Sequence, residues 1–213
     1  MPDVPRVIPL FPLPDVVLFP RVSLPLHIFE PRYRKMVADA LASHKTIGMV
    51  LLRPGWESDY HGRPPVFGTG CAGRIEGCES LSDGKYNIVL RGISRFRVLE
   101  EHAGQPYRLA AVEPRPEAEE AAPVDLEAAR RRVMAAIGKA ADGPAIMVLN
   151  ADLPHAVFVD ALSQSLPLAP VERQSLLDCD TVSSRYERLL EILDFRLMER
   201  TYGTPRSRTP VVH

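Results

Sequence analysis

The sequence lacks the features that mark a membrane protein, a disulfide-stapled protein or a general nucleic-acid binder. Its three cysteines, Cys71, Cys78 and Cys179, are too few and odd in number, so they cannot form a disulfide framework. It has no run of roughly 18 apolar residues, the length that a membrane-spanning helix needs, and no signal-peptide layout at its start. Its net charge of −1 lacks the cationic surplus behind non-specific nucleic-acid binding. We therefore expect a soluble, cytoplasmic protein with no membrane partner.

The motifs of the common catalytic sites are missing as well. No phosphate-binding loop, no GxSxG nucleophile elbow and no HExxH zinc motif occurs. Cys71 and Cys78 lie in one predicted strand on opposite faces, so we expect two buried thiols and not a metal site. His61 lies in a loop and can titrate near neutrality, but a histidine among turn residues is usually solvated. The sequence predicts no catalytic residue, metal or cofactor, and a hydrolase built around His61 is the third-ranked alternative.

Proline, in contrast, is abundant. It accounts for 21 of 213 residues, which is about twice its average usage, and many of these prolines fall in the first 31 residues among apolar and aromatic side chains. A disordered proline-rich tail would be poor in such side chains. Proline in a sheet is confined to edges, strand starts and bulges. We therefore expect short, broken strands of the kind that close a small barrel.

Residues 1–115 are predicted to form this β-rich subdomain, with one helix inserted. Pro31 suits the first position of that helix because its missing N–H would have no partner there, and apolar residues at helical spacing continue to Leu41. Asp83-Gly84 separates two long strand patterns and predicts a two-residue hairpin in which both turn residues have positive φ. Strands are expected over residues 46–53, 66–81, 85–102 and 107–112.

Residues 116–200 are predicted to form a helical subdomain. The acidic, proline-containing segment 114–124 marks the boundary, and Asp125 can cap the first helix. Further helices are expected after Pro154, Pro170 and Thr181, and Asp142-Gly143-Pro144 is expected to end the first of them. Residues 201–213 have little apolar content to bury and are predicted to be a flexible tail. The expected fold class is α+β, a small β-barrel with one inserted helix followed by a C-terminal helical bundle.

Three aromatic residues near the middle of the chain are candidates for binding a protein. Trp56, the single tryptophan, shares a loop with Tyr60, and Phe67 follows that loop. Aromatic side chains on loops are favoured anchors because they bury a large area at little cost in torsional freedom. The alternative is that Trp56 covers one end of the barrel.

Four arginines are candidates for binding phosphate or RNA. Arg91, Arg95 and Arg97 follow one another along a predicted strand, and Arg74 lies on the neighbouring strand. Together they could form a cationic stripe on one face of the sheet. Interleaved glutamates favour ordinary cross-strand charge pairs instead.

Several short motifs occur in a fixed order along the chain. They are PLFPLP at residues 9–14, VLFP at 17–20, LPLHIFEPRY at 24–33, IGMVL at 47–51, GTGCA at 68–72, RGISRFRV at 91–98 and PVERQSLL at 170–177. In this order they resemble the amino-terminal, substrate-binding domain of the Lon ATP-dependent protease family, over about residues 6–198. The resemblance implies a PUA-like, six-stranded barrel followed by a helical bundle. It also implies core positions for Phe11, Phe19, Leu26, Ile28 and Phe29.

In this family the domain engages protein substrates and helps to assemble the oligomer. The ATPase and Ser–Lys protease modules of the family have no counterpart in the sequence, so no catalytic residue can be carried over. The leading hypothesis is a stand-alone, non-enzymatic binding or adaptor domain for exposed apolar or unfolded protein segments. The binding groove would lie near Trp56, Tyr60 and Phe67, or between barrel and helices.

Under this hypothesis the partners are client proteins and, in addition, a separate ATP-dependent protease, with a homo-oligomer left open. The runner-up is an RNA- or nucleotide-binding PUA-like module that uses Arg74, Arg91, Arg95 and Arg97. Nucleic acid is the less favoured partner of the two because glutamates interleave with these arginines.

Overall fold

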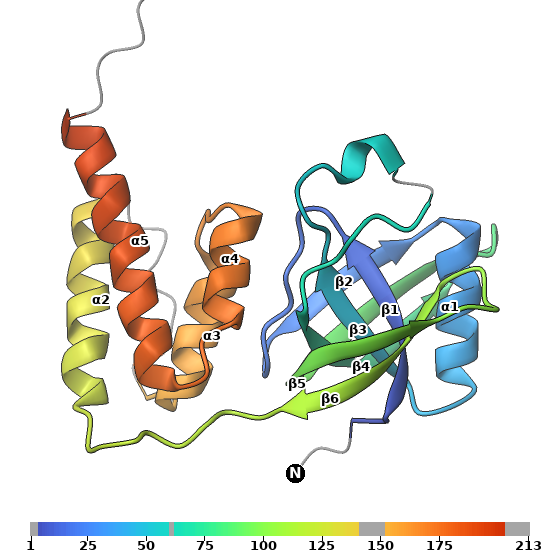
Figure 1. The fold of residues 1–213 in the computed structure, drawn as a ribbon, viewed down its shortest axis with the longest axis horizontal. Helices are drawn as coiled ribbons and strands as arrows, with labels where there is room; N and C mark the ends of the chain where they lie inside the picture. Colours follow the sequence, from blue (N-terminus) through green and yellow to red (C-terminus); the bar gives the residue numbers. More distant parts are fainter. Residues whose placement is uncertain (1–3, 60–61, 141–151, 203–213) are drawn as a thin grey trace, which may run out of the picture.

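A sheet of six strands precedes four helices in the chain (Figure 1). The computed structural model describes residues 4–59, 62–140 and 152–202. The strands are β1 (Val7–Leu13), β2 (Ser23–Ile28), β3 (Thr46–Leu51), β4 (Thr69–Ser80), β5 (Tyr86–His102) and β6 (Arg108–Arg115). The helices are α1 (Pro31–Leu41), the 3-10 helix η1 (Trp56–Asp59), α2 (Leu126–Ala140), α3 (His155–Ser165), α4 (Pro170–Leu177) and α5 (Val182–Tyr202). The predicted break at residues 142–144 lies outside the described residues. The tail predicted over residues 201–213 is wrong at its start, because Thr201 and Tyr202 belong to α5, and its remainder from residue 203 lies outside the described residues.

The strands follow the order β2-β5-β4-β3-β1-β6, and β6 also pairs with β5. This second pairing bends the sheet into a partial, barrel-like ring. It is possible because β5 is long: its first half pairs with β2 and β4, and its second half pairs with β4 and β6. Register shifts in the β4–β5 pair mark bulges, which let strands bend. The α+β fold class is therefore confirmed, with the barrel only partly closed.

The interior of the ring is a small apolar core built around Phe96. The ring of Phe96 is fully buried among side chains that include Ile8, Leu10 and Val50. Gly70 makes room for it, because a Cβ there would lie 2.5 Å from the Met49 carbonyl oxygen and 2.6 Å from Phe96 Cζ. A glycine inside this strand is thus required by packing and not by backbone conformation.

The predicted bounds of α1 are confirmed, whereas the predicted turn between β4 and β5 is not. The helix begins at Pro31 and ends at Leu41, as predicted. The two-residue hairpin is wrong: Gly84 has φ +75° but Asp83 has no positive φ. The Gly84 amide donates to the Leu81 carbonyl, and the Leu81 amide donates to the Lys85 carbonyl. These bonds form a three-residue loop, in which only the last residue needs a left-handed conformation.

Burial differs from expectation at Phe29. Phe11, Phe19 and Ile28 are buried as expected, but Phe29 is 58% exposed. It lies between the end of β2 and the first residue of α1, where the chain leaves the sheet, so its side chain faces solvent instead of the core. This exposed ring forms part of the surface discussed below.

The helices pack as a group beside the sheet, with α2 alongside α5 (Figure 1). Asp125 caps α2 as predicted, since its Oδ1 accepts a hydrogen bond of 2.8 Å from the Ala128 amide. Side chains of all four helices belong to the same apolar core as those of α1 and the outer face of the sheet. Within the described part of the chain, no helix is long and apolar enough to cross a membrane.

Gly70→Ala is expected to lower the free energy of unfolding by about 1–3 kcal/mol, because an added methyl group overpacks the ring around Phe96. Urea unfolding measures the change. Gly68→Ala is the matched control, since a Cβ at Gly68 meets no atom within 4 Å. Equal stabilities for the two variants would contradict the tight packing described here.

Candidate protein-binding site

The loop between β3 and β4 carries the aromatic residues predicted to bind protein. Trp56 begins η1 and is half-buried, and Phe67 is half-buried just before β4. The Arg53 guanidinium lies 5.8 Å from the centre of the Phe67 ring. Tyr60, the third residue of this set, lies outside the described residues, as does His61. The loop therefore exposes only part of the Trp56 and Phe67 rings.

The four arginines predicted to form a cationic stripe do not lie together. Arg74 and Arg91 are direct neighbours across the β4–β5 pair. Arg97, with its side chain 59% exposed, forms an ion pair with Glu113 on β6. Arg95 is only 2% exposed. Two of the four arginines are thus adjacent, and the arrangement gives no support to the RNA- or nucleotide-binding alternative.

The buried Arg95 joins the sheet to the helices. Its guanidinium donates hydrogen bonds to the carbonyls of Leu177 (3.2 Å), Cys179, Asp180 (3.1 Å) and Pro116 (3.2 Å). The first three of these carbonyls lie at or just beyond the end of α4, where a helix leaves its last carbonyls unsatisfied and carries partial negative charge. Arg95 supplies both the missing donors and the complementary charge.

A second set of charges surrounds this contact. The fully buried Arg185 of α5 pairs with Asp160 of α3 at 2.9 Å and with Glu117 of the linker at 2.8 Å. Arg21, from the loop before β2, pairs with the same two carboxylates. A cavity of about 350 Å³ lies beside these charges, lined by the loop before β2, by β5, by the end of β6 and by the linker. Because its charged groups pair with one another, we interpret this region as a structural junction.

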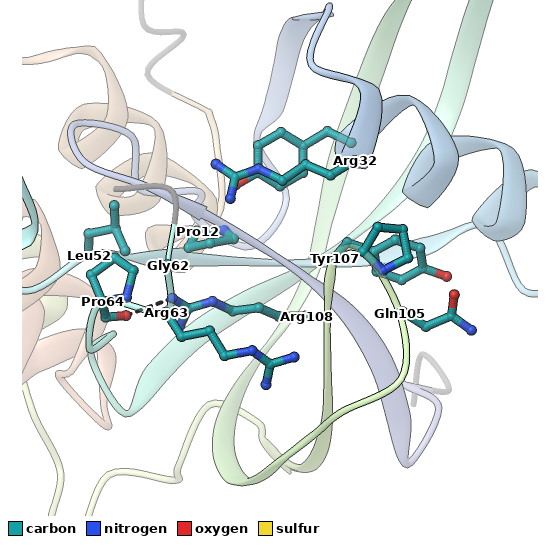
Figure 2. A pocket seen from close by; sticks show the side chains of 11 residues that line it. Pro12, Arg32, Leu52, Gly62, Arg63, Pro64, Gln105, Tyr107 and Arg108 are labelled. Atoms are coloured by element: carbon teal, nitrogen blue, oxygen red, sulfur yellow. Dashed lines mark hydrogen bonds between the residues drawn. The ribbon is translucent and has the colours of Figure 1, made fainter. Parts of the chain in front are cut away.

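A pocket of about 250 Å³ opens at the rim of the barrel, under the loop before β4. Its walls come from β1, β3, α1, the loop and the start of β6: Pro12, Arg32, Tyr33, Leu52, Gly62, Arg63, Pro64, Gln105, Pro106, Tyr107 and Arg108. Figure 2 shows Arg32 on one side of the pocket and Arg63 and Arg108 on the other. None of the described lining residues is acidic, and their side chains are mainly cationic or apolar.

Neighbouring groups hold the polar side chains of this pocket in place. Arg108 donates to the Pro64 carbonyl at 2.8 Å and pairs with Glu101 at 3.3 Å. The Tyr107 hydroxyl donates to Asp39 at 2.8 Å. Burial, reinforced by that hydrogen bond, raises the pKa of Tyr107 to about 12. Tyr107 therefore stays neutral at physiological pH and adds no negative charge near the arginines.

A groove of about 610 Å³ runs across β2, β5 and β4. Pro25, Leu26 and Val89 supply apolar walls, and Val89 is 37% exposed. The exposed ring of Phe29 stacks on His27, which lines the groove, with 6.1 Å between ring centroids. Sequence reasoning missed this surface because Phe29 was assigned to the core.

A hydrogen-bonded chain of polar side chains borders the groove. His27 Nδ1 donates to Asn87 Oδ1 at 2.8 Å, and Asn87 Nδ2 donates to Glu79 at 2.9 Å. The three residues occupy facing positions on β2, β5 and β4. An apolar floor with a satisfied polar border is the usual anatomy of a protein-binding patch.

The thiols do not have the properties of nucleophiles. Burial raises the pKa of Cys71 and Cys179, and partial desolvation raises that of Cys78, so each thiol is protonated at neutral pH. Cys78 is exposed, which corrects the expectation of two buried thiols. In the described ranges no group of three or more His, Cys, Asp or Glu side chains is placed to hold a metal ion.

Comparison with known proteins gives one consistent result. Residues 7–194 match the family model of the ATP-dependent protease La (LON) substrate-binding domain. The chain is 28% identical over 200 residues to Lon protease 2 of Myxococcus xanthus, and 28% identical over 200 residues to Lon protease of Anaeromyxobacter dehalogenans. These alignments cover 90% of this chain but only 24% and 23% of the relatives. The chain thus spans about a quarter of the length of the curated relatives it matches.

Solved structures agree. A Lon N-terminal domain protein from Xanthomonas campestris is 26% identical and superposes with a TM-score of 0.64, covering 87% of this chain and 97% of that one. The N-terminal domain of a Lon protease of the Mycobacterium avium complex is 17% identical with a TM-score of 0.67, covering 88% and 98%. At 17% identity the second likeness shows the fold alone.

Arg95→Met is expected to lower the free energy of unfolding by about 3 kcal/mol, because it leaves several buried carbonyls without donors. Arg97→Met, two residues along the same strand, is the control: its ion pair is exposed and should contribute less than about 1 kcal/mol. Urea unfolding of both variants measures the difference. Similar losses would contradict the assignment of Arg95 as the junction residue.

Proposed function

The chain belongs to the family of Lon substrate-binding domains, and on this premise we propose that it is a non-enzymatic module that binds exposed apolar or unfolded segments of other proteins. A binding role for apolar segments requires apolar surface that solvent can reach. The exposed face of β2 and β5 meets this requirement, and it is the observation that carries the proposal. The module holds its clients and transforms none of them.

Exposure favours the groove on β2 and β5 as the client site over the aromatic loop. Phe29 is 58% exposed and Val89 is 37% exposed, whereas Trp56 and Phe67 are each half-buried in the loop. A large exposed ring beside an apolar groove is the arrangement in which a partner gains most from burial. The loop residues Trp56 and Phe67, with Tyr60, remain the second candidate site.

The family relationship also suggests partners and a place of action. An ATP-dependent protease, in the same polypeptide or separate, would receive the bound clients. Since Lon proteases are the relatives, the proposed compartment is the cytoplasm.

The test is isothermal titration with reduced, carboxymethylated α-lactalbumin, a permanently unfolded probe. Wild type is expected to bind it, and the double variant Phe29→Ser/Val89→Ser is expected to bind about tenfold or more weakly, because each lost apolar contact is worth about 1 kcal/mol or more. Absence of binding by wild type would overturn the proposed function.

Two further variants locate the site. Leu99→Ser is the matched control: Leu99 is also 58% exposed and lies on β5, but about 34 Å along the strand from Val89. It should bind like wild type. If Trp56→Ala alone weakens binding while the Phe29/Val89 pair does not, the client site lies on the loop.

A further inference from the structure

Arginines dominate the polar lining of the rim pocket among the described residues. Arg32 pairs with Glu30 at 3.0 Å and Arg108 pairs with Glu101 at 3.3 Å. Arg63 has no carboxylate within ion-pair distance among the described residues. Among the described side chains, three guanidinium groups line the pocket and no acidic residue does. This lining favours an anionic group as the occupant.

Contacts within the protein preorganise two of the pocket arginines for binding an anionic group. Arg108 is buried and fixed by its two polar contacts. The Arg32 guanidinium stacks on the Tyr33 ring, 4.6 Å from its centroid. A planar guanidinium presents paired donors that match the two oxygens of a carboxylate. Because contacts within the protein already fix the guanidinium groups of Arg32 and Arg108, these side chains lose little conformational freedom when a ligand binds.

The remaining walls limit what can enter. Pro12, Leu52 and Pro64 make one side of the pocket apolar, and about 250 Å³ of space accommodates a group the size of one amino acid. We propose that this pocket binds a carboxylate of a client polypeptide, from either an acidic side chain or the chain terminus, together with the apolar atoms next to it. This inference rests on the proposed function and narrows its substrate class.

The pocket and the apolar groove are close enough for one client segment to reach both. His27 lines the groove, Arg32 lines the pocket and the exposed Phe29 lies between them in sequence. Five residue steps span at most about 18 Å. An extended segment can therefore place apolar residues against Phe29 and a carboxylate among the arginines. The preferred client is an apolar segment that carries a negative charge at one end.

Fluorescence anisotropy with three short apolar peptides of otherwise identical sequence tests this. The first has a free carboxyl terminus and no acidic side chain, the second has an amidated terminus and one Glu, and the third has an amidated terminus with Gln in place of Glu. At least one of the first two is expected to bind about tenfold more tightly than the third, the effect of a charged hydrogen bond. The peptide that binds more tightly shows whether the carboxylate comes from the chain terminus or from an acidic side chain.

Arg63→Gln should abolish this preference while leaving the third peptide's affinity unchanged. Arg74→Gln is the control, because Arg74 is exposed on β4 outside the pocket and the substitution removes the same charge. Equal binding of all three peptides to wild type, or equal losses in both variants, would overturn the carboxylate site and leave the proposed function intact. Failure of every peptide to bind would overturn both.

Discussion

The guanidinium of Arg95 is the contact on which the arrangement of the molecule depends. It leaves a strand of the barrel and satisfies carbonyls at the end of α4 and in the linker. A buried cation without partners would be costly, so the helices must stay docked wherever the strands have formed. Arg185 is likewise a buried cation, and its ion pairs with Asp160 and Glu117 join α5 to α3 and to the linker.

This junction separates structural charges from those available to a ligand. The charged groups between barrel and helices pair with one another, so they hold the two parts together. The groove on β2 and β5 and the rim pocket both lie on the barrel, and Phe29 lies in sequence between His27 of the groove and Arg32 of the pocket. Because both surfaces belong to the same barrel, the strands keep them in a constant relation. Binding can then use preformed sites instead of ordering new ones.

Local chemistry allowed much of the fold to be predicted. The start of α1 at Pro31 and the cap of α2 at Asp125 depend only on neighbouring residues, and both are confirmed. The site was harder to predict. Arg95 lies in a strand with alternating charges, a pattern that predicts a solvent-exposed side chain. Phe29 follows a run of core residues, which predicts a buried one. Arg95 is buried by residues that are distant in sequence, and Phe29 is exposed because the chain leaves the sheet there.

The sequence alone thus determined the family, the α+β class and most element boundaries, because helix caps, prolines and alternating patterns act within a few residues. Only the tertiary structure decided which charges are buried and which surfaces are open. Burial of Arg95 requires α4, some 80 residues later in the chain, to bring its carbonyls to β5. Likewise the three arginines of the rim pocket lie together only because α1, a loop and β6 converge at one place. Contacts between residues so distant in the chain produce no local sequence pattern from which they could be predicted.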